Sequence, residues 1–106
     1  MLANTELFTD YTKLIRIRFD AAEQEHQVES LAQELYDSYI EEADVTMLAA
    51  LIMILNHKCW DFFNAKDEAT SRKYADLYYV YNEKAWDWLE KNDTEEEKTW
   101  FFETLD

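Results

Sequence analysis

The sequence predicts an all-α protein, a compact bundle of about five helices with an apolar third helix at its centre. The chain contains no glycine and no proline. Hairpin turns and phosphate-binding loops depend on glycine, whereas long helices joined by short turns need neither residue. Apolar side chains also recur at helical spacing along most of the chain. At 106 residues, 48% of them hydrophobic, the chain is long enough for one core, so we expect a single domain, 1–106.

We expect the first helix to run from about Thr5 to Phe19, because its apolar residues lie three and four apart. Asp20 and Glu23 have the spacing of a capping box, which predicts a second helix from about Ala21 to Ala43. The segment between them contains no strong helix breaker, so a continuous helix is the alternative.

The third helix is expected from Val45 to Phe63, with Asn64 as a left-handed C-cap. Its unbroken apolar run, Met47 to Leu55, is shorter than the roughly 20 residues that a bilayer span needs. A helix that is apolar around its whole circumference is typical of one surrounded by other helices. This pattern predicts the centre of the bundle.

A fourth helix is expected from about Thr70 to Lys91, ending at Asn92. Thr94 and Glu97 form a second capping box, which predicts a short final helix through Leu105.

The end of the third helix carries His57 and Cys59, but these lie about 200° apart around a helix and cannot act as a base and a nucleophile on each other. We interpret Cys59 as a buried, inert side chain. His57 and Asp61 lie four residues apart, a spacing that suits half a metal site or a simple ion pair, and we interpret His57 as a structural residue, either neutral or ion-paired. This stretch is therefore expected to be core, with no catalytic residue, no cofactor site and no metal site.

Two metal-enzyme alternatives remain. Glu23 and His26 match the Glu-x-x-His motif of di-iron helical proteins, which require two such motifs. Glu34-x-x-Asp37 and Glu41-x-x-Asp44 resemble the paired acids of magnesium-dependent, all-α nucleotide pyrophosphohydrolases, although such sites need carboxylates from separate helices. The protein is expected not to be an enzyme, with the pyrophosphohydrolase as the alternative.

The net charge of −14 is distributed unevenly. Residues 1–19 carry +1, residues 20–57 carry −9 without any lysine or arginine, and residues 58–106 carry −6. On a helical wheel, five carboxylates of the expected second helix form one outward stripe opposite its apolar side. They are Glu23, Glu34, Asp37, Glu41 and Asp44.

Like charges one turn apart repel each other and lower the stability of the helix, so we expect the stripe to provide some advantage outside the helix. One hypothesis is solubility alone. The other is a basic protein partner, in particular a nucleic-acid-binding protein that meets a DNA-mimicking surface; direct binding to nucleic acid is disfavoured. Arg16 and Arg18 of the first helix could pair with the stripe and neutralise part of it.

Aromatic side chains gather towards the C-terminus, and twelve of the seventeen lie between Trp60 and Phe102. A single helix face cannot bury all of them. Either the last helix folds back over the fourth and covers Tyr79 and Trp86, or the surplus forms an interface, most simply in a homodimer. The candidate interface residues are Tyr79, Trp86, Trp100 and Phe101.

A single cysteine rules out an intrachain disulfide, and the first residues lack the basic-then-apolar pattern of a signal peptide. The sequence thus indicates a cytoplasmic location, with no membrane contact expected. The function that we expect is that of a small acidic protein-interaction module.

Overall fold

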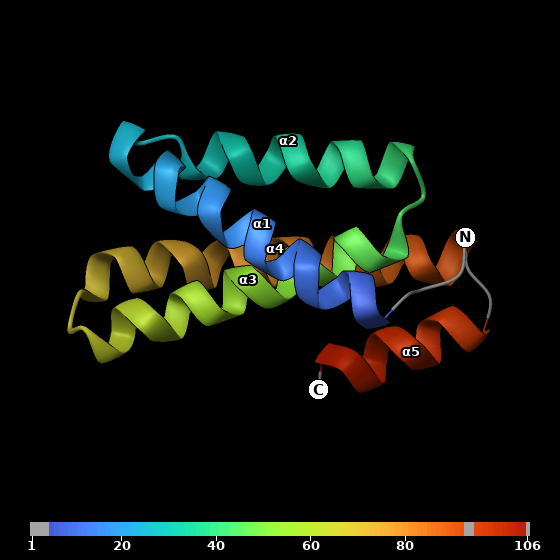
Figure 1. Cartoon of the computed structure of the whole chain (residues 1–106). Helices are drawn as coiled ribbons and strands as arrows, with labels where there is room; N and C mark the ends of the chain where they lie inside the picture. Colours follow the sequence, from blue (N-terminus) through green and yellow to red (C-terminus); the bar gives the residue numbers. More distant parts are fainter. Residues whose placement is uncertain (1–4, 93–94, 106) are drawn as a thin grey trace.

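The structure, a computed structural model, describes residues 5–92 and 95–105, and these fold into five α-helices without any strand (Figure 1). The all-α prediction is confirmed. The helices are α1 (Thr5–Glu25), α2 (Val28–Glu41), α3 (Val45–Asn64), α4 (Glu68–Asn92) and α5 (Glu95–Leu105).

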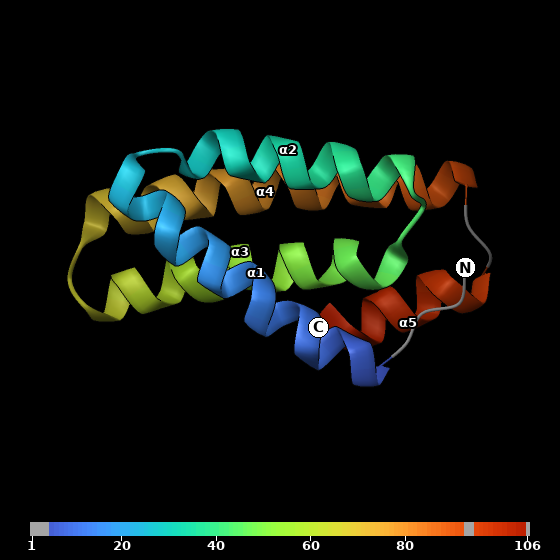
Figure 2. The same ribbon diagram turned by 45° about the horizontal axis from the view of Figure 1, so that its top comes forward.

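The arrangement places α3 in the middle, as the sequence predicts, because it contacts each of the other four helices. α3 and α4 form a long antiparallel hairpin, which has the most extensive contact in the molecule. α1 crosses the outside of α3 obliquely, α2 lies along α4, and α5 returns beneath the half of α3 that is nearest its N-terminus (Figures 1 and 2).

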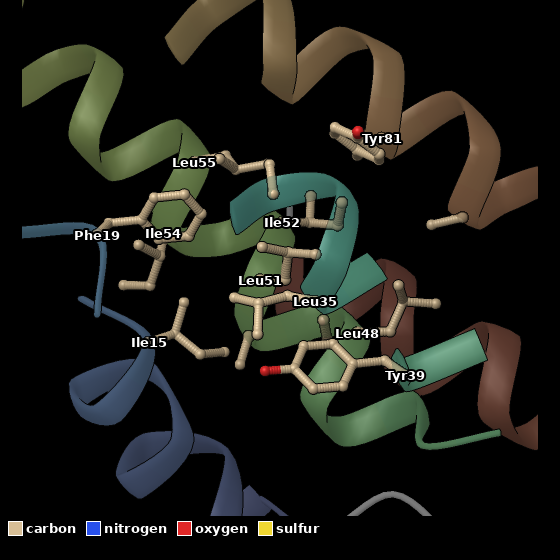
Figure 3. Packing of buried hydrophobic residues seen from close by; sticks show 14 of the residues in the cluster. Ile15, Phe19, Leu35, Tyr39, Leu48, Leu51, Ile52, Ile54, Leu55 and Tyr81 are labelled. Atoms are coloured by element: carbon tan, nitrogen blue, oxygen red, sulfur yellow. The ribbon is translucent and has the colours of Figure 1, made fainter. Parts of the chain in front are cut away.

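The core is built around the apolar side chains of α3. Leu48, Leu51, Ile52, Ile54 and Leu55 are at most 2% exposed, and they meet Ile15 and Phe19 of α1 and Leu35 and Tyr39 of α2 (Figure 3). Among the described residues α3 is the one helix whose length and hydropathy would also suit a membrane span. Because 56% of its most apolar window is buried inside the bundle, it has the character of a core helix.

The boundary between the first two helices differs from the prediction. α1 continues through the expected cap at Asp20 and ends at Glu25, and α2 begins at Val28. Phe19 and Ala22, on either side of the expected break, are both buried against the core. Continuing the helix keeps both side chains on the inward face, since residues three apart share a face.

Three helices end in the same hydrogen-bonded turn, the Schellman motif. At the end of α2 the Ala43 amide donates to Ile40 O at 3.1 Å and the Asp44 amide to Tyr39 O at 3.0 Å. α1 and α3 end in the same way, so that His26, Ala43 and Lys66 have φ between 53° and 63°. The prediction of Asn64 as the left-handed residue is wrong, because Asn64 is still helical and Lys66 takes that role.

α4 begins two residues before its predicted start, because Asp67 caps it. The Asp67 carboxylate accepts hydrogen bonds from the Thr70 amide at 3.1 Å and from the Thr70 hydroxyl at 2.8 Å. α4 ends at Asn92, one residue beyond the predicted Lys91, and Asn92 is itself helical rather than a left-handed C-cap. The predicted capping residue of α5, Thr94, lies outside the described residues.

The left-handed turn at Ala43 predicts a stabilising substitution. Ala43 is exposed, so its methyl group contributes little packing, while left-handed backbone costs a residue with a Cβ about 1–2 kcal/mol. We expect Ala43→Gly to raise the free energy of unfolding by about 0.5–1 kcal/mol, after the greater entropy of glycine in the unfolded chain is subtracted. Urea denaturation measures it. Ala75→Gly, in the middle of α4, is the control and should instead lower stability by about 1 kcal/mol; equal losses in both variants would contradict the account.

Candidate functional site

The outer side of α2 carries three exposed carboxylates, Glu34, Asp37 and Glu41, which we call the α2 acidic face. Their spacings of three and four residues put them on one side of the helix, and the buried residues of α2 lie on the other side. Within the described residues, none of the three forms an ion pair with a lysine or arginine. Asp37 accepts one hydrogen bond, from Gln33 Nε2 at 2.8 Å.

The negative charge of this region acts on the tyrosines beside it. Burial and then the neighbouring Asp37 raise the pKa of both Tyr36 and Tyr81 above the ordinary value of 10.0. Burial also raises the pKa of Tyr39 to about 12; Asp44 and Glu42 add to this, and Arg18 opposes them. Carboxylates of α2 and its C-terminal end therefore act on these tyrosines, with Arg18 opposing them at Tyr39. The Lys84 ammonium also lies 5.9 Å from the ring centroid of Tyr36 and 5.4 Å from that of Tyr81.

Glu23 does not belong to this face, which corrects the prediction. It lies on α1, is 19% exposed, and points to Lys58 of α3, whose ammonium Nζ is 3.1 Å from its carboxylate. The same carboxylate accepts a hydrogen bond of 2.5 Å from the Tyr74 hydroxyl, and Asp20 forms a second ion pair with Lys58. Glu23 thus neutralises a lysine that is only 5% exposed.

Asp44 is also separated from the α2 acidic face. It is the N-cap of α3, and its carboxylate accepts a hydrogen bond of 3.0 Å from the Met47 amide. N-cap aspartates satisfy helix amides that have no partner within the helix. The predicted stripe of five residues is therefore three residues of α2 flanked by two carboxylates with structural roles.

The arginines of α1 leave the α2 acidic face largely uncompensated. Arg16 pairs with Asp61 of α3 at 2.8 Å, so the carboxylate considered as a possible partner of His57 is paired with an arginine. Arg18 is exposed and lines a shallow groove between α1 and α2, in which Glu34 is also found. It is the one arginine of α1 placed to moderate the charge of α2.

The fold-back alternative holds at Trp86, which packs against rings of α5, but not at Tyr79. Phe101 is fully buried, and its ring contacts Trp86 edge-on with centroids 5.2 Å apart. Trp100 packs on Phe8 at 5.8 Å, and its indole N–H donates to the Thr5 hydroxyl at 3.2 Å. Tyr79 is not covered and remains 67% exposed. Of the four candidate residues, Tyr79 alone is left as an open aromatic surface.

The polar end of α3 is more exposed than expected at His57 and less exposed at Lys58. His57 is exposed, and Cys59 is half-buried with its sulfur 3.6 Å from the Ser71 hydroxyl. Sequence reasoning missed Lys58 as the charged residue that the fold encloses. A lysine at the end of an apolar run carries no signal for its partners, which come from residues 35 and 38 positions earlier.

Metal ligands are not gathered in the part of the chain that the structure describes: it contains no group of three or more His, Cys, Asp or Glu side chains arranged to hold an ion. The two acid pairs weighed for magnesium lie along α2 and at the α3 cap rather than facing each other from separate helices.

Comparison with protein families, curated proteins and solved structures gives no match to this chain. The function must therefore be argued from the chain's own surfaces.

The buried cluster of Lys58 predicts a large loss of stability when one charge is removed. We expect Lys58→Met to lower the free energy of unfolding by about 2–4 kcal/mol, because the Glu23 carboxylate then stays inside without a cation. Lys58→Met combined with Glu23→Gln should recover part of the loss. The measurement is urea denaturation, and Lys91→Met at the exposed end of α4 is the control, expected within about 0.5 kcal/mol of the parent chain. A double variant less stable than Lys58→Met alone would contradict this role.

Tyr39 predicts a loss of stability in alkali. Its folded-state pKa of about 12 lies above the ordinary value of 10.0, so its contribution is complete below pH 10 and disappears as the pH rises through 12. Between pH 9 and 11.5 the parent chain should lose about 2 kcal/mol more than Tyr39→Phe, in urea denaturation at both values. The control variant Tyr79→Phe, at an exposed position, should lose as much free energy of unfolding between these pH values as the parent chain does. Identical losses in the parent and Tyr39→Phe would contradict the assignment.

Proposed function

We propose that this protein is a non-enzymatic interaction module that binds a basic protein partner through the α2 acidic face. The observation that carries the proposal is the contrast between the acids of this region. Asp20, Glu23 and Asp44 have structural partners, whereas Glu34, Asp37 and Glu41 are exposed and form no ion pair with a lysine or arginine of the described residues.

The α2 acidic face lowers the stability of the helix that carries it. Glu34 and Asp37 are three apart and Asp37 and Glu41 four apart, and such like-charged pairs cost about 0.2–0.5 kcal/mol each. Glu41 is also the last residue of α2, where the helix dipole disfavours a negative charge. A basic partner would turn both costs into favourable interactions, and it would be attracted over a distance by the same charges.

The spacing supports a partner that ordinarily binds nucleic acid. At a rise of 1.5 Å per residue the three carboxylates follow one another at roughly 4.5 and 6 Å along the helix axis. Phosphates of one DNA strand are about 3.4 Å apart along the duplex axis. A basic surface made for phosphates could therefore contact the three carboxylates in succession, and the release of counterions from both surfaces would favour the complex.

The test compares two triple variants of equal charge. Glu34→Gln, Asp37→Asn and Glu41→Gln together change the net charge from −14 to −11, and so do Glu83→Gln, Glu96→Gln and Glu103→Gln at exposed positions of α4 and α5. Immobilised parent chain and both variants are exposed to an extract of the native cell. A basic protein captured by the parent is identified by mass spectrometry, purified and titrated against all three.

We expect the α2 triple variant to lose the partner and the control triple to keep it, with affinity that falls as salt is raised. Equal loss in both variants would show that net charge alone attracts basic proteins, and unchanged capture by the α2 triple would show that this face is only solvated surface. Either result overturns the proposal.

The α2 triple should also be more stable than the parent, which separates loss of binding from loss of fold. Relief of the repulsion and of the unfavourable dipole at Glu41 is expected to raise the free energy of unfolding by about 0.5–1 kcal/mol in low salt. Urea denaturation with circular dichroism detects the change, which should shrink in high salt. A less stable triple variant would contradict the electrostatic account of α2.

A further inference from the structure

The outward side of α1 carries a row of exposed apolar side chains. Leu14 is 56% exposed, Ile17 is 63% exposed and Leu7 is 42% exposed. The other exposed large hydrophobic residues are spread over α3, α4 and α5, and the Trp60 and Phe63 rings contact each other. α1 alone presents three such residues in succession on one helix face.

The row has the spacing of a coiled-coil seam. Leu7, Asp10, Leu14, Ile17 and Ala21 are separated by three, four, three and four residues, which is the a/d pattern of the heptad repeat. All five are exposed. The core-facing residues of α1, namely Phe8, Ile15, Phe19 and Ala22, lie on another side of the helix. α1 therefore has one face for the bundle and a second face suited to another helix.

We propose that this seam binds a second copy of the same chain, α1 packing antiparallel against α1 around a two-fold axis between Leu14 and Ile17. The distribution of charge points to this occupant. Residues 1–19 carry +1 while the remaining residues carry −15, so the first part of α1 is where two copies meet with the least repulsion. In such an isologous contact, the apolar row of each copy is buried against the same row of the other copy.

The residues beside the seam favour the antiparallel orientation. In a parallel pair Lys13 would face the partner's Arg18, and Asp20 would face the partner's Glu25, so that both flanking pairs would repel. In the antiparallel pair Lys13 lies close to the partner's Asp20, and Arg18 lies close to the partner's Tyr11. Leu14 then packs on the partner's Ile17, and Asp10 lies opposite the partner's Ala21. Asp10 is the one polar residue among the five seam residues.

The oligomeric state of the full chain tests the proposal directly. Sedimentation equilibrium at micromolar concentration should show a dimer of the parent chain. Leu14→Lys with Ile17→Lys should weaken it by about 100-fold or more, because two apolar side chains are lost from each copy. Val80→Lys, at a comparably exposed apolar position on α4, is the control and should leave the dimer intact.

Misfolding of the double lysine variant could also abolish the dimer, so a second substitution is chosen that should strengthen the dimer instead. Asp10→Leu replaces the polar seam residue by an apolar one and should tighten the dimer by about tenfold. A monomeric parent chain, a dimer unaffected by the double lysine variant, or a dimer that Asp10→Leu does not tighten would each overturn the proposal.

The orientation has its own readout. With Cys59→Ser and Glu6→Cys, a spin label at residue 6 should lie roughly 25–35 Å from its copy in the antiparallel dimer, given a rise of 1.5 Å per residue and the spacing of packed helices. A parallel dimer would bring the two labels within roughly 15 Å, and that distance would overturn the arrangement.

Discussion

α3 has apolar side chains around almost its whole circumference, and most of them are kept from water because the other four helices contact it, while Trp60 and Phe63 near its end stay exposed. This requirement determines what each neighbouring helix can do. α1, α2, α4 and α5 each commit one face to α3, and their remaining faces are free for other tasks. Most of the charged side chains are therefore carried by the four surrounding helices.

Enclosure also explains how the acids are used. Lys58 comes from the central helix and is buried, so it needs a compensating charge in a region of low dielectric. Asp20 and Glu23 supply this charge, and the Tyr74 hydroxyl satisfies a further acceptor position on Glu23. Some acidic residues thus serve the fold, whereas the three of the α2 acidic face form no ion pair with a lysine or arginine of the described residues.

The sequence predicts the number and type of helices well, because periodicity and the absence of glycine and proline are local signals. It fails at Asp20 and Glu23, which have the spacing of a capping box but serve Lys58, at a distance that no local pattern records. It also fails at Asn64, since α3 continues through Asn64 and the left-handed residue is Lys66, two residues before α4 begins at Glu68. The stripe of five carboxylates followed from the misplaced boundary, and only its three residues within α2 share a face. The apolar row of α1 is visible in the sequence, but without the fold Leu14 and Ile17 cannot be told from residues of the core.

The two proposed surfaces differ in their physical basis, although they lie on neighbouring helices. The α2 acidic face would attract a partner through unlike charges, so salt should weaken that complex. The α1 seam would join two chains that each carry −14, so salt should reduce the repulsion between them while the apolar contact remains. A basic partner bound to α2 would neutralise part of the same repulsion. By thermodynamic linkage, binding of that partner would then favour the dimer, and the dimer would bind the partner more tightly. The two proposed surfaces would therefore be coupled through charge even if no residue contacted both partners.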